Sequence, residues 1–362
     1  MRHGTSLFKR ARAALTVAAL ALVWPATAGA VETITMTAAS GYSPVAAWVK
    51  VFQGYFMPEV NRRLEEAGGH YRIEWIEAFS GTVVKPRGEL EAVETGIADI
   101  AIVVSAFHVD KVPLYNVAFA TPFVTTDLEL VLRTVDQLSE QFPAMKNSWL
   151  KYNQVYLACA GTVDRYQVVT KRPVKALKDF AGMKIGGAGP NLLWLEGLGA
   201  TGVNSNLGEF YNGIQNGIFD GVVVWPEAAA NFKLYEVAPY YLQSDITATN
   251  SFAVTVNKDF WDGLPEPVRQ VLQLTATAYR DELARTVLAQ SKISEQAYRD
   301  QGGQITKLAP EDRDRWAKAL PPIAGNWADE AERQGLPGRA VLKAYMDVMR
   351  ASNQPIARQW DQ

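Results

Sequence analysis

Few residues in this chain could carry out chemistry on a bound molecule. His108 follows an apolar run, so it is either a proton donor or ligand contact in a cleft or a solvated loop histidine. Cys159, the only cysteine, lies in another apolar run, which favours a buried and inert thiol over a nucleophile. If the chain were an enzyme, Glu77, His108 or Glu209 would be the candidate base of a lyase or isomerase.

Sequence motifs of common catalytic and nucleotide-binding sites are absent. The sequence has no Gly-x-Ser-x-Gly elbow, no Walker loop, no zinc pattern and no His-Glu-x-x-His helix. The loop at residues 186–189 (Gly-Gly-Ala-Gly) precedes an expected helix start, where N–H groups and the helix dipole favour anions. Its spacing matches neither the dinucleotide nor the P-loop pattern, so only backbone donation to a ligand oxygen is considered. We expect no enzyme activity, no cofactor and no metal site.

The elements that would position such residues occur twice in the sequence. An amphipathic helix runs into Gly-Ile-x-Asp and then an apolar strand at residues 94–104, and the pattern recurs at residues 215–225. The glycine suits the left-handed position that closes a helix, and the apolar run indicates a strand buried on both faces, as in a parallel sheet. We interpret the two aspartates as structural residues that cap the turn into each strand. The repeat predicts two similar α/β lobes that face each other as a clamp.

Strand and helix patterns alternate in the first lobe. Residues 34–38 and 71–78 predict strands, and residues 45–66 and 87–95 predict helices. This order predicts a parallel sheet whose ligand-facing loops follow the carboxyl ends of the strands. Three aromatic residues end strands of this lobe and are candidates for a partly aromatic pocket: Tyr42, Phe79 and Phe107.

The second lobe repeats this plan. Strands are predicted at residues 155–162, 166–170 and 184–185, and a helix at residues 191–198 that Asn191 opens. Trp194 lies on that helix and could belong to the cleft or to the core. Asn206 and Glu209 resemble a capping box at the start of the next helix.

Two later segments are expected to cross between the lobes. Residues 246–256 alternate and predict a strand that passes back between the lobes. A helix predicted to begin at Pro265 meets no breaker before Gly302, and about 35 residues at ~1.5 Å each would span roughly 50 Å. A helix of that length exceeds one lobe and should bridge both. Several crossings between two lobes suit a hinge.

The first thirty residues read as a cleavable signal peptide. A basic start, an apolar stretch from Ala13 to Val23 and a small-x-small site at residues 28–30 form the secretory pattern, while the apolar stretch is too short for a membrane anchor. Without the four basic residues of this segment, 32 basic residues stand against 38 acidic ones, a net charge of about −6. A mildly acidic surface without Lys/Arg clusters argues against nucleic acid or an anionic membrane as partner. We expect a periplasmic protein.

A longer motif in the second lobe identifies a family. The pattern Glu-x-Tyr-x-x-x-Gln-x-Gly-x-x-Asp-Gly runs from Glu209 to Gly221, within a segment at residues 179–239. This segment resembles the solute-binding proteins of the tripartite ATP-independent periplasmic (TRAP) transporters, dicarboxylate-binding type. The resemblance implies a two-lobed α/β clamp like that of periplasmic binding proteins, each lobe a mainly parallel sheet flanked by helices. It also implies one small ligand in the cleft and delivery to an ion-gradient-driven membrane permease.

The chain departs from the family at two places that bear on the ligand. The resemblance implies an arginine after Lys184-Ile185 whose guanidinium grips a carboxylate, but this chain has Gly186 there. Arg165 lies near a second position where the family often places a basic ligand contact, although it could equally pair with its neighbour Asp164. Trp225 falls near a family ligand contact, where it would offer an apolar wall or a cation–π face. Lys85 and Arg87 are further basic candidates.

The sequence predicts a signal peptide followed by two lobes, each built from two separate segments of the chain. We assign residues 1–30 to the signal peptide, residues 31–157 and 247–286 to lobe I, and residues 158–246 and 287–362 to lobe II. The expected function is capture of a small organic solute, an organic acid that could be aromatic, for a TRAP-type permease; the alternatives are a ligand-presenting sensor subunit and an exported lyase or isomerase. We expect a monomer. The predicted ligand-binding residues are Arg165, Trp225, Asn191, Trp194, Gly186, Tyr42, Phe79, Phe107, His108 and Glu209.

Overall fold

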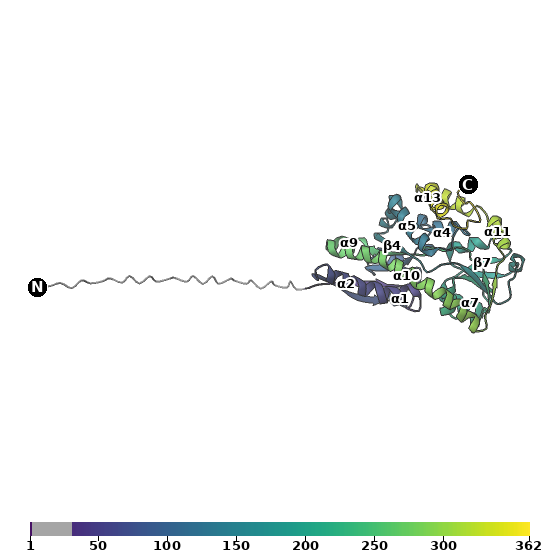
Figure 1. Ribbon diagram of the computed structural model, residues 1–362, viewed down its shortest axis with the longest axis horizontal. Coiled ribbons are helices and arrows are strands. Elements are labelled where there is room, and N and C mark those ends of the chain that lie inside the picture. The colour runs from purple at the N-terminus through teal and green to yellow at the C-terminus, as the bar shows by residue number, and fades with distance from the viewer. Residues whose placement is uncertain (2–30) are drawn as a thin grey trace.

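The structure, a computed structural model, describes Met1 and residues 31–362. The predicted signal peptide lies, apart from Met1, outside the described residues. Two β-sheets flanked by helices form the folded part, with α2 (Met57–Glu66) near one end of the molecule and α7 (Leu207–Gln215) and β7 (Thr201–Asn204) near the other (Figure 1). This arrangement confirms the predicted two-lobed α/β fold, although both sheets are mixed, with antiparallel as well as parallel pairs.

The first sheet has the strand order β2-β1-β3-β10-β4. Strand β1 pairs in parallel with β2 and β3, whereas β10 runs antiparallel to both β3 and β4. Every residue of β3 and β10 is buried, as expected for apolar strands covered on both faces. The strands span Glu32–Ala39 (β1), Tyr71–Ala78 (β2), Ile100–Val104 (β3), Gln154–Ala160 (β4) and Phe252–Asn257 (β10).

The second sheet repeats this topology and adds one strand, in the order β11-β9-β5-β8-β6-β7. Strand β6 pairs in parallel with β7 and β8, and β5 runs antiparallel to β8 and β9. Thus β5 takes the place in this sheet that β10 takes in the first. The strands span Gln167–Thr170 (β5), Lys184–Gly187 (β6), Thr201–Asn204 (β7), Gly221–Val224 (β8), Tyr240–Gln243 (β9) and Gln304–Lys307 (β11).

The doubled Gly-Ile-x-Asp unit has the same structure in both lobes. Gly96 and Gly217 have φ angles of 74° and 73°, the left-handed conformation that the sequence predicts. Asp99 accepts a hydrogen bond from the backbone N–H of Thr37 at 2.7 Å. Asp220 does the same for Lys184 at 2.9 Å. Each aspartate therefore ties its strand to the neighbouring parallel strand, which confirms the structural interpretation.

Helices cover both sheets, and two of them differ from expectation. The predicted helix at 45–66 contains a π-helical turn, Phe52–Phe56, between α1 and α2. The predicted helix at 191–198 is instead a 3₁₀ segment, η5 (Gly189–Leu195), ahead of Gly197 and Gly199, which both have positive φ. Other helices are α1 (Ala47–Val51), α2 (Met57–Glu66), α3 (Glu89–Glu94), α4 (Val117–Ala120), α5 (Leu128–Gln141), α6 (Pro143–Leu150), α7 (Leu207–Gln215), α8 (Pro226–Asn231) and α9 (Lys258–Gly263).

The long helix α10 (Glu266–Asp300) has 35 residues and bridges the lobes as predicted. It packs against β4 and α2 on the first lobe and against α8 and β11 on the second. Within the described part of the chain, neither α10 nor a shorter helix combines the length and apolarity needed to cross a membrane.

The chain crosses between the sheets three times. The first crossing joins β4 to β5, the second joins β9 to β10, and α10 is the third. The predicted strand at 246–256 is regular only from Phe252; before it, Thr249 pairs with Val163, so the first two crossings run side by side. The last helices are α11 (Pro310–Ala319), α12 (Ile323–Arg333) and α13 (Gly338–Ala351). Because α12 and α13 pack on α4 and α5, the end of the chain returns to elements that precede β4.

The division of the chain into lobe I (residues 31–157 and 247–286) and lobe II (residues 158–246 and 287–362) stays a prediction.

Candidate ligand-binding site

A cavity lies at the edge where the two sheets face each other. Tyr42 follows β1, Phe107 follows β3, and Trp225 follows β8, so the cavity sits at the carboxyl ends of the parallel strands. Because β5 and β10 run antiparallel, their starts lie at the same edge and bring in Tyr166 and Phe252. The cavity volume is about 40 Å³, and all the space among the lining atoms, open solvent included, is about 490 Å³.

Aromatic side chains dominate the lining. Trp48 stacks on Phe252, with ring centroids 4.7 Å apart and planes 29° apart, and lies 6.3 Å from Trp225. Trp225 in turn meets Tyr166 edge-on at 6.0 Å. Apolar residues fill the rest of the wall. The aromatic residues of the lining are Tyr42, Trp48, Phe107, Tyr166, Phe210, Trp225 and Phe252.

Three lining residues carry polar side chains: Tyr166, Asn191 and Ser251. The Ser251 hydroxyl lies 3.0 Å from that of Thr249. Burial raises the pKa of Tyr166 to about 12, so the phenol keeps its proton as a donor at neutral pH. Oδ1 of Asn191 accepts from the backbone N–H of Ala188 at 3.0 Å, which leaves the amide NH₂ as a donor.

No lysine, arginine or histidine of the described residues lines the cavity. Arg87 lies close by, with its guanidinium carbon 4.4 Å from the ring centroid of Phe107. Its Nη2 donates across the cleft to Oδ1 of Asn204 at 3.0 Å and to the carbonyl of Ser205 at 3.1 Å. Arg87 therefore joins the first lobe to the second beside the cavity.

Two buried carboxyl groups, those of Glu89 and Glu227, lie outside the cavity lining. Oε1 of Glu89 accepts from the backbone N–H of Gly41 at 3.0 Å, and its Oε2 has no partner within the described part of the chain. Oε2 of Glu227 accepts from the indole N–H of Trp225 at 3.0 Å. Burial is the main cause that raises the pKa of each carboxyl to about 7. Burial also raises the pKa of Tyr42, with a contribution from nearby Glu89.

Four of the predicted ligand-binding residues line the cavity: Tyr42, Phe107, Asn191 and Trp225. Trp194 lies in a second layer, stacked on Phe119 and donating to its carbonyl at 2.9 Å. Phe79 is buried away from the cavity lining, because it follows β2, the outer strand of its sheet. Whether these residues contact a solute stays a prediction.

Two titratable candidates lie outside the cavity lining. His108 is 5% exposed, so the alternative of a solvated loop histidine is wrong; burial lowers its pKa, and its Nε2 has no partner among the described residues. Glu209 is exposed on α7 and accepts a hydrogen bond from the Ser205 hydroxyl at 2.8 Å. Cys159 is buried, and burial raises the pKa of its thiol, which agrees with an inert role.

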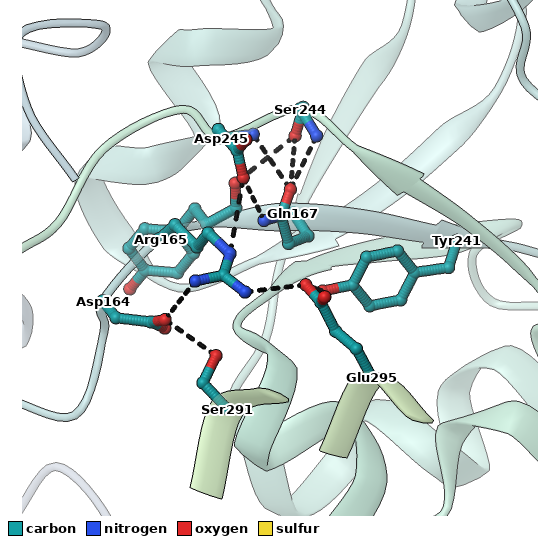
Figure 2. A network of polar contacts seen from close by, with 9 residues as sticks. Asp164, Arg165, Gln167, Tyr241, Ser244, Asp245, Ser291 and Glu295 are labelled. Atoms are coloured by element: carbon teal, nitrogen blue, oxygen red, sulfur yellow. Dashed lines mark hydrogen bonds and ion pairs between the residues drawn. The ribbon is translucent and has the colours of Figure 1, made fainter. Parts of the chain in front are cut away.

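Arg165 lies in a charge network at the hinge (Figure 2). Its guanidinium contacts Asp164 at 2.7 Å, Glu295 at 2.9 Å and Asp245 at 3.4 Å. Asp164 also accepts from the Ser291 hydroxyl at 2.7 Å. Arg165 belongs to the first crossing, Asp245 to the second, and Glu295 and Ser291 to α10, so one side chain links all three crossings.

The surroundings of Gly186 leave little room for a side chain. A Cβ atom on Gly186 would lie 3.0 Å from Cγ1 of Val222 and 3.2 Å from the ring of Phe219. An arginine at this position would therefore require Phe219 to move. The ring of Phe219 thus occupies the space that an arginine side chain at position 186 would need.

Sequence reasoning missed several lining residues, most clearly Trp48, Tyr166, Phe210 and Phe252. Trp48 and Phe210 lie on helices, where an aromatic residue ordinarily indicates core. Tyr166 directly precedes β5 and Phe252 is the first residue of β10, and only the antiparallel direction of those strands brings their starts to the cleft edge. An aromatic residue at the start of each of these two strands was the available signal.

Two facing α/β lobes with a partly open cavity at the carboxyl ends of their strands define a solute-binding clamp. The model of one such family, bacterial extracellular solute-binding protein family 7 (DctP), matches residues 54–330. The chain belongs to this family, the periplasmic solute-binding proteins of TRAP transporters.

Individual relatives show how far this similarity extends. The chain is 31% identical over 179 residues to the C4-dicarboxylate-binding periplasmic protein DctP of Rhodobacter capsulatus, covering 48% of this chain and 51% of that protein. The match thus spans about half the length of that relative. It is 25% identical over 321 residues to the ectoine-binding periplasmic protein TeaA of Halomonas elongata, covering 80% of this chain and 90% of that protein.

A solved structure confirms the fold. The TRAP solute-binding protein of Rhodoferax ferrireducens T118, in complex with copurified benzoate, superposes with a TM-score of 0.77 at 18% identity. The superposition covers 88% of this chain and 98% of that one.

Proposed function

We propose that this protein captures one small organic acid in the aromatic cavity and delivers it to the membrane subunits of a TRAP-type permease. The observation that carries the proposal is a cavity to which both lobes contribute walls. The relatives and structural neighbours are named for dicarboxylates, ectoine and benzoate, which supports an organic acid as the ligand class.

Closure of such a clamp requires contacts from the solute to both lobes. A ligand shifts an open–closed equilibrium only by its difference in affinity for the two states. Tyr42 and Trp48 would contact the solute from the first lobe, and Asn191 and Trp225 from the second. A solute held between these pairs stabilises the closed state because the open state separates them.

We propose that the solute leaves chemically unchanged. Catalysis needs an acid or base within hydrogen-bonding reach of the reacting group. The three candidate bases, Glu77, His108 and Glu209, are not among the cavity-lining residues, and Glu77 accepts from the amide of Gln53 at 2.5 Å.

Small-angle scattering and thermal unfolding across a panel of organic acids test this proposal. A cognate solute should reduce the radius of gyration and raise the melting temperature. At a hundredfold excess of solute over Kd, the free energy of unfolding should rise by about 2.7 kcal/mol. Mass spectrometry of the released solute checks that it is unchanged. If no compound compacts or stabilises the protein, solute capture is contradicted; a chemically altered product would instead indicate an enzyme.

A further inference from the structure

The aromatic walls of the cavity suit a positive charge. Trp48, Trp225 and Tyr166 present rings to the same space, with centroid separations of 6.3 Å and 6.0 Å along the series. The face of an aromatic ring carries a partial negative charge, so it attracts a cation and repels a carboxylate. In a cavity walled by several such rings, a cationic centre can contact more than one face.

Charged groups around the walls reinforce this preference. Glu227 accepts the indole N–H of Trp225 at 3.0 Å, and a carboxyl oxygen at the edge of the indole makes its face more electron-rich. Glu89 lies behind Tyr42. None of the described cavity-lining residues is cationic, and the guanidinium of Arg87 already lies over Phe107. The aromatic cage therefore has two buried carboxyl groups with a pKa near 7 outside it and one cation, Arg87, at its edge.

The polar part of the wall has the opposite preference. The hydroxyl of Tyr166, the amide NH₂ of Asn191 and the hydroxyl of Ser251 are hydrogen-bond donors carried by cavity-lining residues. Neutral donors of this kind can hold a carboxylate without an arginine.

We propose that the cognate solute is a small zwitterionic organic acid: its quaternary or otherwise delocalised cationic centre occupies the aromatic cage, and its carboxylate faces Tyr166 and Asn191. This inference rests on the proposed function and specifies its ligand. It accounts for Gly186, because the carboxylate is held from the Tyr166 side of the cavity and an arginine at position 186 is not needed.

Four probes of nearly identical shape separate the charge contributions. Glycine betaine carries both charges, 3,3-dimethylbutanoate only the anion, choline only the cation, and 3,3-dimethylbutan-1-ol neither. We would measure each Kd by calorimetry on protein that was unfolded and refolded to release copurified solute. Benzoate serves as an aromatic anion of different shape, with compaction followed by small-angle scattering.

Glycine betaine should bind at least about tenfold more tightly than 3,3-dimethylbutanoate, since the two differ only in the cation. Choline should bind more tightly than 3,3-dimethylbutan-1-ol by a similar factor. Equal affinity within either pair, or no binding of the two quaternary ammonium probes, overturns the inference. If benzoate then still compacts the protein, the proposed function stands and only the zwitterion is excluded.

The variant Tyr166→Phe tests the carboxylate end. Loss of one donor should weaken glycine betaine and 3,3-dimethylbutanoate roughly tenfold and leave choline within about twofold. Tyr345→Phe is the matched control, because Tyr345 is a buried tyrosine outside the cavity lining. If Tyr166→Phe weakens choline as much as the betaine, the hydroxyl does not hold the carboxylate. The isostere series in the unmodified protein decides the cation independently of whether this variant folds.

Discussion

At the scale of single residues, Glu89 links stability to pH. Its carboxyl is fully buried, and burial raises its pKa from 4.5 to about 7. Below about pH 4.5 the carboxyl is protonated in both folded and unfolded chains. Between about pH 4.5 and 7 the unfolded chain has released the proton while the folded chain keeps it, so the stability that this group contributes falls as pH rises. Above about pH 7 the loss is complete.

Glu89→Gln should remove this pH dependence while its amide oxygen still accepts from Gly41. We expect the variant to melt roughly 2–5 °C above the wild type at pH 8, because an uncharged side chain avoids the desolvation of a carboxylate. At pH 4.5 the two melting temperatures should coincide. Glu74→Gln, on the exposed side of β2, is the control and should shift neither value. A difference that is the same at both pH values would contradict the assignment.

The residue scale is also where sequence reasoning reached its limit. Tyr42, Phe107 and Trp225 could be placed because each follows a strand, and the cleft edge of a parallel sheet is known in advance. Trp48 and Phe210 could not, because a helix has several faces and only tertiary packing decides which one meets the other lobe. Arg165 has the charge of a ligand contact, yet three carboxylates surround it. Its predicted contact with a ligand stays a prediction.

At the scale of elements, the sequence was far more informative. The strand β2 and the start and length of α10 were predicted within a residue or two, because turn residues and prolines mark their ends. Both copies of the Gly-Ile-x-Asp unit have the predicted backbone. The 3₁₀ form of η5 could not be predicted, since its tight geometry depends on contact with the first lobe: a Cβ on Gly189 would lie 2.7 Å from the carbonyl oxygen of Ala106.

The charge network around Arg165 should stabilise the hinge more than surface pairs do. Arg165→Ala leaves three carboxylates without a counter-charge, and we expect the free energy of unfolding to fall by about 2–4 kcal/mol. This estimate is at the lower end for buried pairs because the Arg165 side chain is 21% exposed. Urea unfolding provides the measurement.

The control for this prediction is Arg285→Ala. Arg285 pairs with Glu282 on α10, but its side chain is 63% exposed, so the expected loss is below about 0.5 kcal/mol. Equal effects of the two substitutions would show that the hinge network contributes no special stability. If Arg165→Ala lowers the free energy of solute binding by more than it lowers the free energy of unfolding, the ligand contact that the sequence suggested would be favoured.

At the scale of the whole molecule, Arg87 forms hydrogen bonds from the first lobe to the second, and we expect these bonds to favour the closed state. It has a φ of 80°, a conformation that costs a non-glycine residue of order 1 kcal/mol or more, and its side chain reaches Asn204 and Ser205 on the second lobe. Arg87→Ala should enlarge the radius of gyration of the solute-free protein and weaken solute binding several-fold, because the closed state becomes less populated.

Arg87→Ala should leave the melting temperature of the protein nearly unchanged, since it removes only two hydrogen bonds between the lobes. Arg72→Ala, an exposed arginine on β2, is the control and should alter neither scattering nor affinity. Unchanged scattering and affinity in Arg87→Ala would mean that the cross-lobe bonds do not hold the clamp closed.

The position of β10 has a consequence for the order in which the protein can be assembled. In the first sheet β4 is joined to β3 only through β10, and β10 begins at Phe252, after every strand of the second sheet except β11. A chain that emerges from its N-terminus therefore cannot complete its first lobe until most of the second has been made. We therefore expect the N-terminal half alone, which lacks β10, not to form the complete first sheet.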